Sequence, residues 1–169
     1  MNDTPRKLTV GNYAYVVKCK LAVASLRKVD DPLRLAHTVR HLGDAYYYAG
    51  RASQAEPCYV EALSIYRRHE QRRPLDLANA IRSFAVLKDE VGAAEEAQHL
   101  WQEAHDLYVA VNVQAGVAES VARLALLASH LGDVYRRREW LGKAIAAADA
   151  TDDPETLQYV REIRAQTEH

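Results

Sequence analysis

The chain has 169 residues, of which 49% are hydrophobic, so it is long enough to form one domain with a substantial core. Its 22 Lys and Arg residues are balanced by 23 Asp and Glu residues, giving a net charge of −1 and no basic excess of the kind that nucleic-acid-binding proteins carry. No apolar run is long enough to span a bilayer and no signal peptide is recognisable, so we expect a cytoplasmic protein without a nucleic-acid or membrane partner.

The residue usage favours an all-helical, non-catalytic protein. Only 7 Gly and 5 Pro occur, whereas the strong helix formers Ala and Leu are abundant. Cys19 and Cys58 have neither the CxxC nor the Cys/His spacing of a zinc site, and we expect free thiols. The sequence has no Gly-rich phosphate loop and no recognisable nucleophile–base pair, so it predicts neither a cofactor nor an enzyme.

The N-terminal part predicts a short lead-in and one strongly apolar helix. Residues 1–11 are expected to be flexible, and residues 12–169 to form a single helical-repeat domain. Asn12 can cap a first helix over 12–29. Because apolar residues surround this helix on nearly all sides, we expect it to be buried on more than one side. These residues are Tyr13, Val16, Val17, Leu21, Val23, Ala24 and Leu26.

A repeat with a period of 42 residues follows. Segments 32–69 and 74–111 align with this constant offset, and each predicts two helices joined by a turn at a glycine. A third copy, 113–150, follows with an offset of 40, because the linker before it is shorter by two residues. Matching positions are Pro32 and Pro74; Gly50, Gly92 and Gly132; Ala55 and Ala97; Tyr59 and Trp101; and Tyr66 and Tyr108.

Local signals define the start of the repeats and the end of the chain. Asp30-Asp31-Pro32 returns as Asp152-Asp153-Pro154, and in both places Asp can cap a helix whose first turn tolerates Pro. The final segment, 153–167, predicts a capping helix with a narrow apolar stripe. Gly43 lies on the core stripe of its helix, where it predicts close packing, and Tyr59 and Trp101 are expected to fill the space between helices.

At this point the residues resemble a known family. Leu42, Gly43 and Tyr46, followed by Ala55, Tyr59 and Ala62, resemble the tetratricopeptide repeat consensus. The long period and the run Ala55-Glu56-Pro57 are more similar to the repeats of kinesin light chains and related bacterial proteins. The resemblance covers roughly residues 32–150 and implies an all-α, right-handed superhelical array of about eight antiparallel helices, an α-solenoid. It also implies a protein-binding scaffold.

The second copy departs from the consensus at one position. Lys88 stands where the first helix of the repeat should carry an aromatic residue. We expect the run Lys88-Asp89-Glu90 to lie on the surface, as charge runs on helices usually do.

The resemblance places a concave groove along the first helix of each repeat. The first two repeats each offer an arginine, an acid and another polar residue there, and the third offers an apolar patch. Arg40 and Arg82 match each other and could hold a carboxylate of a protein or peptide partner. The predicted partner-binding residues are His37, Arg40, Asp44, Tyr47, Asn79, Arg82, Val86, Asp89, Glu119 and Leu126.

Three alternatives remain open. Arg40 and Asp44 lie four residues apart on one helix and could neutralise each other. His37, His41 and Asp44 share a face, as a metal site or an active centre with Tyr47 would require, but a metal site needs further ligands and we predict none. The apolar helix over 12–29 favours a structural homo-oligomer that self-associates through its end helices.

Overall fold

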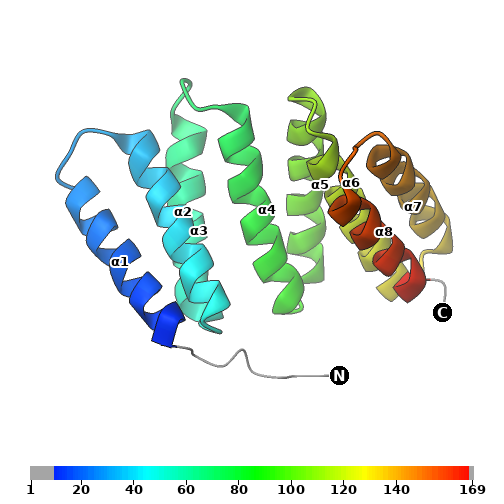
Figure 1. The fold of residues 1–169 in the computed structure, drawn as a ribbon, viewed down its shortest axis with the longest axis horizontal. Coiled ribbons are helices and arrows are strands. Elements are labelled where there is room, and N and C mark those ends of the chain that lie inside the picture. Colours follow the sequence, from blue (N-terminus) through cyan, green and yellow to red (C-terminus); the bar gives the residue numbers. More distant parts are fainter. Residues whose placement is uncertain (1–9, 168–169) are drawn as a thin grey trace. The chain divides into compact units, whose positions relative to one another are not determined.

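The protein is all-helical, as predicted. A computed structural model describes the backbone of residues 10–167 and the side chains of residues 13–167; the predicted lead-in lies almost wholly outside them. This part of the chain has no strand (Figure 1), and no helix in it is long and apolar enough to cross a membrane. The helices are α1 (Val10–Leu26), α2 (Pro32–Tyr48), α3 (Ala52–Arg68), α4 (Pro74–Glu90), α5 (Ala94–Ala110), α6 (Gln114–His130), α7 (Val134–Asp149) and α8 (Pro154–Thr167).

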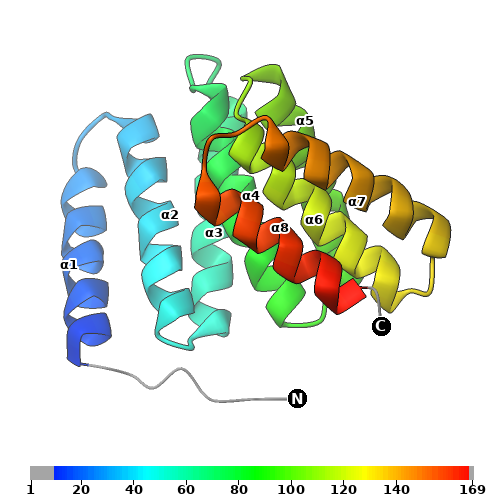
Figure 2. The ribbon, with the colours of Figure 1, turned by 45° about the vertical axis from the view of Figure 1, so that its right-hand side comes forward.

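The helices group into two compact units, residues 1–91 and 92–169, and the division falls at Gly92 within the second predicted repeat. In unit 1, each of α1, α2 and α3 packs against the helix that follows it, and α2 also contacts α4. In unit 2, α6 contacts α5, α7 and α8, and α8 also contacts α7 (Figure 2). Packing between consecutive helices is the pattern expected of stacked repeats.

The sequence signals for helix ends act as expected. The carboxylate of Asp31 accepts a hydrogen bond of 3.1 Å from the amide of Arg34, and that of Asp153 accepts one of 3.1 Å from Thr156. Each bond satisfies an amide that the first turn of a helix leaves unpaired. Gly50 follows α2 with a φ of 71°, a conformation that glycine adopts without steric cost. These caps fix where α2 and α8 begin and where the chain turns into α3.

The core of unit 1 is built around Tyr59. Its side chain is almost fully buried, and a Cβ added at Gly43 would lie 2.7 Å from its Cε1 atom. This spacing confirms that Gly43 allows close packing of α2 on α3, because any side chain there would displace the ring. The ring also lies 5.9 Å from that of Phe84 on α4, measured between centroids. Tyr59 thus joins three helices of the unit.

Unit 2 repeats this construction with different residues. Trp101 of α5 is completely buried, and the guanidinium of Arg123 lies 5.9 Å from its ring centroid. A Cβ added at Gly116 of α6 would lie 2.5 Å from the ring of Tyr108, so α5 and α6 are also in close contact. The burial of both Tyr59 and Trp101 confirms the core positions that the repeat predicts.

The first helix is less buried than expected. α1 begins at Val10, so Asn12 lies inside the helix instead of capping it. Val16 and Val23 are buried, but Tyr13 is 57% exposed and Leu21 is 68% exposed. The expectation of burial on more than one side is therefore wrong for the single chain: α1 packs against α2, which covers one stripe of it.

Lys88 is buried, which corrects the prediction that it lies on the surface. Its Nζ atom donates a 2.7 Å hydrogen bond to the carboxylate of Glu56 on α3 and lies 5.1 Å from the centroid of the Phe84 ring. It occupies the core-facing position at which the repeat consensus has an aromatic residue. The long alkyl chain fills that space while the ammonium group reaches a half-exposed acid at the edge of the core.

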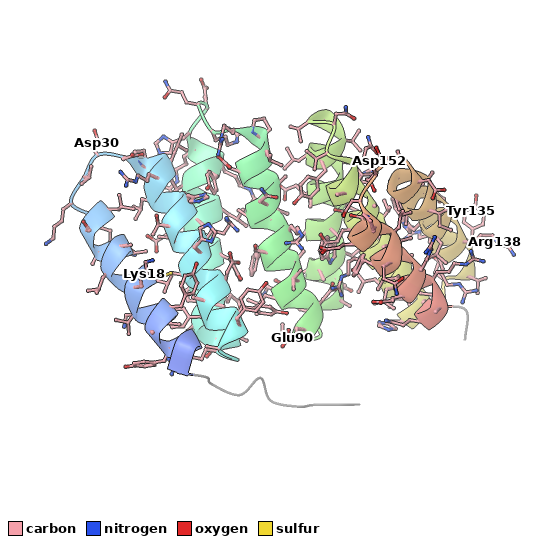
Figure 3. The ribbon with its side chains drawn as sticks, viewed as in Figure 1. Lys18, Asp30, Glu90, Tyr135, Arg138 and Asp152 are labelled. Carbon is pink, nitrogen blue, oxygen red and sulfur yellow. The ribbon has the colours of Figure 1, made fainter. Side chains whose placement is uncertain are left out.

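Trp101 provides the test of this packing. Replacing it with Ala should lower the free energy of unfolding by about 3–5 kcal/mol, because large-to-small substitutions in a core lose both burial and packing. Urea unfolding followed by circular dichroism measures this loss. The control is Tyr135→Ala, since Tyr135 is 81% exposed on α7 (Figure 3) and should change stability by less than about 0.5 kcal/mol. Equal effects of the two substitutions would contradict the proposed register of α5.

Candidate functional site

The predicted partner-binding residues lie on three helices. α2 carries His37, Arg40, Asp44 and Tyr47, and α4 carries the matching residues of the second repeat; these two helices contact each other in unit 1. α6 of unit 2 carries Glu119 and Leu126, which are half-buried. Ala122, which lies between them on the same stripe, is completely buried, so the apolar patch predicted in the third repeat is partly covered.

Asp44 is the centre of the polar cluster in unit 1. One carboxylate oxygen accepts a 3.0 Å hydrogen bond from Nη1 of Arg40, and the other accepts a 2.9 Å bond from the hydroxyl of Tyr59. The Arg40 and Asp44 side chains are only 14% and 18% exposed. The internal pairing of Arg40 that the sequence left open is therefore present, and solvent screens it less than it screens an exposed pair.

Two histidines extend this cluster along α2. Nε2 of His41 lies 2.9 Å from Nη2 of Arg40 and 3.1 Å from Nε2 of His37. Since a guanidinium can only donate, Nε2 of His41 must accept, and its proton belongs on Nδ1, which lies 3.5 Å from the Asp44 carboxylate. Nε2 of His37 shares this acceptor with Arg40, because a ring nitrogen has one lone pair. The two rings contact each other, and no group of three or more candidate ligands in the described chain is arranged to hold a metal ion.

The electrostatics of the cluster follow from this geometry. Burial alone raises the pKa of Asp44, but hydrogen bonding from His41, the charge of Arg40 and hydrogen bonding from Tyr59 outweigh it, so the pKa lies below its usual value. Burial and the adjacent carboxylate raise the pKa of Tyr59, so its hydroxyl stays protonated and donates. Burial, His41 and Arg40 lower the pKa of His37. The cluster therefore fixes Arg40 in one orientation.

The matching residues of α4 are also partly exposed. Asn79, Arg82, Val86 and Asp89 are all half-buried, on a helix whose other faces contribute much of the core. Ser83 of the same helix helps to lower the pKa of Asp44, which ties α4 to the cluster on α2. The sequence did not identify Tyr59 as part of the site, because it occupies a core position of the repeat, and no motif marks Ser83 as a site residue.

Asp44 gives the site a measurable pH dependence. Because its pKa is lower in the folded chain than in the unfolded one, its contribution is present above about pH 4 and is lost as the pH falls through the folded value. We expect Asp44→Asn to lower the free energy of unfolding by about 1–3 kcal/mol at pH 7, and the gap to the parent to narrow at acidic pH.

Urea unfolding between pH 7 and pH 3 measures the Asp44 effect. Asp30→Asn is the matched control, since Asp30 is exposed in the loop before α2 (Figure 3) and should change little at any pH. A gap between parent and Asp44→Asn that stays constant over this range would show that the ionised carboxylate is not the source of the stability.

Comparison with known proteins supports the fold. No family model matches the sequence, and no curated protein matches it. The structure is similar to the crystal structure of BtubC (BKLC) from P. vanneervenii, a kinesin light chain-like protein, with a TM-score of 0.72 and 19% sequence identity. The similarity covers 90% of this chain and 63% of that chain, so this chain spans less than two thirds of its neighbour's length. The likeness confirms the predicted tetratricopeptide-like α-solenoid fold.

Proposed function

We propose that the chain is a non-catalytic scaffold that binds a protein or peptide along the face that α2 and α4 share in unit 1. The observation that carries the proposal is the row of half-buried polar side chains at matching positions of these two helices. Most apolar side chains of α2 and α4 are buried in the core. The row of polar positions instead places charged and amide groups where a partner can reach them.

The two arginines have different roles in this proposal. Arg40 is held by Asp44 and His41, so a partner's carboxylate would share its guanidinium with an internal acid. Displacing a largely buried pair costs more than displacing an exposed one. Arg82 lies at the matching position of α4, is half-buried, and has Val86 one turn along the helix where Arg40 has Asp44. We assign the main contact with an acidic group of the partner to Arg82.

The neighbours of Arg82 suit an extended peptide. Asn79 lies one turn before it and can donate to a peptide carbonyl, and Val86 lies one turn after it and offers apolar contact. Tyr47 on α2 adds a half-buried aromatic surface. A partner with an acidic residue flanked by an apolar one fits this arrangement.

Substitution of Arg82 tests the proposal. A peptide selected against the full chain from a random display library should bind Arg82→Ala at least tenfold more weakly, since losing a charged hydrogen bond in an interface costs more than about 1.4 kcal/mol. We expect the melting temperature to change little. Calorimetric titration of parent and variant provides the measurement. Arg138→Ala is the matched control, because Arg138 is exposed on α7 in unit 2 (Figure 3). Unchanged affinity in Arg82→Ala would place the site elsewhere.

A second candidate function is a homo-oligomer that forms through α1. The observation that favours it is the exposed apolar stripe of Tyr13, Val17 and Leu21, which lie four residues apart on one side of α1. The described chain places nothing over this stripe, and a second copy would bury it.

Light scattering at several protein concentrations distinguishes the oligomer from a monomeric scaffold. If α1 mediates association, the average mass of the parent rises with concentration, and Leu21→Glu remains monomeric because a charge cannot enter an apolar interface without loss. Val109→Glu, at an exposed apolar position on α5, should behave like the parent. A parent that stays monomeric at every concentration would eliminate this candidate.

A further inference from the structure

Unit 1 contains a pocket that lies beside the polar cluster, at the junction between its first and second repeats. The pocket has a volume of about 370 Å³ and is open to solvent. Its walls come from the first half of α2, the end of α3, the linker between α3 and α4, and the first turn of α4. Apart from His37, no predicted partner-binding residue lines it. The residues that matter for its chemistry are Arg34, His37, Tyr66, Arg72, Arg73 and Asp76.

The wall of this pocket carries a buried hydroxyl without a partner. Tyr66 is 1% exposed, and its hydroxyl oxygen makes no hydrogen bond to any described residue. Burial, the charge of Asp76 and the opposing charges of Arg40 and Arg73 set its pKa, which is raised to about 12, so the hydroxyl is a proton donor. Buried polar groups are nearly always satisfied, and an orphaned one at a pocket wall calls for an acceptor.

The charged residues of the pocket leave an excess of positive charge. Arg73 and Asp76 neutralise each other through two hydrogen bonds of 2.7 and 2.9 Å. Arg72 donates one bond of 3.2 Å to the carbonyl of His69, which orients its guanidinium without neutralising it. Arg34 makes no ion pair with any described residue. Two guanidinium groups therefore line the pocket without an acidic partner among the described residues, together with the ring of His37.

The repeat shows that packing alone does not require these residues. Forty-two residues on, Arg34 is replaced by Asp76 and His37 by Asn79, and the linker that carries Arg72 and Arg73 is two residues shorter before the third copy. In unit 2, the ring of Tyr108, which matches Tyr66, is packed so closely against Gly116 that a Cβ there would lie 2.5 Å from the ring.

We propose that this pocket binds the dianionic phosphate group of a phosphate monoester, with Arg34, Arg72 and the hydroxyl of Tyr66 as donors. A phosphate monoester carries a charge of about −1.5 to −2 at pH 7, which matches the two guanidinium groups, whereas a carboxylate would leave one of them uncompensated. Planar guanidinium groups bind phosphate oxygens in pairs of hydrogen bonds. The volume of the pocket also leaves room for the organic group that the phosphate esterifies.

The proposal does not depend on the peptide-binding face. His37 connects the two, since it lies at the pocket and also contacts His41 of the Asp44 cluster. The phosphate could belong to a small metabolite or to a phosphorylated side chain, and both present the same chemistry to the pocket.

The test is calorimetric titration of the full chain with inorganic phosphate and with free O-phosphoserine. We expect saturable binding by the parent, competition by sulfate and none by acetate. Arg34→Gln and Arg72→Gln should each bind about tenfold or more weakly, as expected for the loss of a charged hydrogen bond. Tyr66→Phe should also bind about tenfold more weakly with an unchanged melting temperature, because its hydroxyl has no partner to lose in the free protein. Arg68→Gln, on the exposed side of α3, removes the same charge outside the pocket and should bind like the parent.

The results separate the possibilities clearly. If Arg68→Gln weakens binding as much as Arg34→Gln does, the effect is general electrostatic attraction and the site is wrong. Parent-like binding by Tyr66→Phe and Arg34→Gln, or no saturable binding by the parent, would also overturn the proposal. A phosphoserine peptide that binds much more tightly than free O-phosphoserine would support the proposal and identify a phosphorylated segment as the source. Equal affinities would support it and identify a small molecule.

Discussion

The contact between Gly43 and the ring of Tyr59 determines most of the arrangement in unit 1. Because the ring lies where a side chain at residue 43 would be, α2 and α3 approach closely and the hydroxyl of Tyr59 is carried to Asp44. Asp44 in turn pairs with Arg40, and His41 connects this cluster to His37. One aromatic side chain thus fixes both the core packing and the orientation of the polar face. A buried hydroxyl and a largely buried carboxylate are tolerable together because each satisfies the other.

In the second repeat, both Tyr59 and Asp44 are replaced by other residues. Tyr59 is replaced by Trp101, which has no hydroxyl, and Asp44 is replaced by Val86, which has no acceptor. A tyrosine without the acid, or the acid without the tyrosine, would leave a polar group unsatisfied. Trp101 is instead completely buried next to the guanidinium of Arg123. The repeats therefore conserve the shape of the core but not its polar chemistry, and this is why matching positions on α2 and α4 present different charges.

The fold was largely predictable from the sequence because its signals are local and repeated. The caps at Asp31 and Asp153, the turn at Gly50 and the core positions of Tyr59 and Trp101 follow from residue types at fixed spacings, and independent copies reinforce one another. The predictions failed where the answer depends on a neighbour. Lys88 is buried because its ammonium group pairs with the carboxylate of Glu56 on another helix. Much of α1 is exposed because α2 covers one stripe of it. Neither contact can be identified from the sequence of the helix alone.

The candidate site was only partly predictable, for a related reason. Arg40 and Asp44 were recognisable as a possible pair, but the sequence could not show that the pair is largely buried or that Tyr59 completes it. The sequence contains one indication of the pocket around Tyr66. At this place the chain departs from the repeat, with a longer linker and basic residues that the next copy lacks. In a repeat protein, residues common to all copies maintain the stacking of helices, so that requirement explains them without reference to function. Residues found in one copy only are not explained by stacking, and a function that acts at one place in the array must depend on them. Arg34, His37 and Arg72, which the next copy lacks, lie together with the unpaired hydroxyl of Tyr66 at one such place, and so the search for a ligand of this chain begins there.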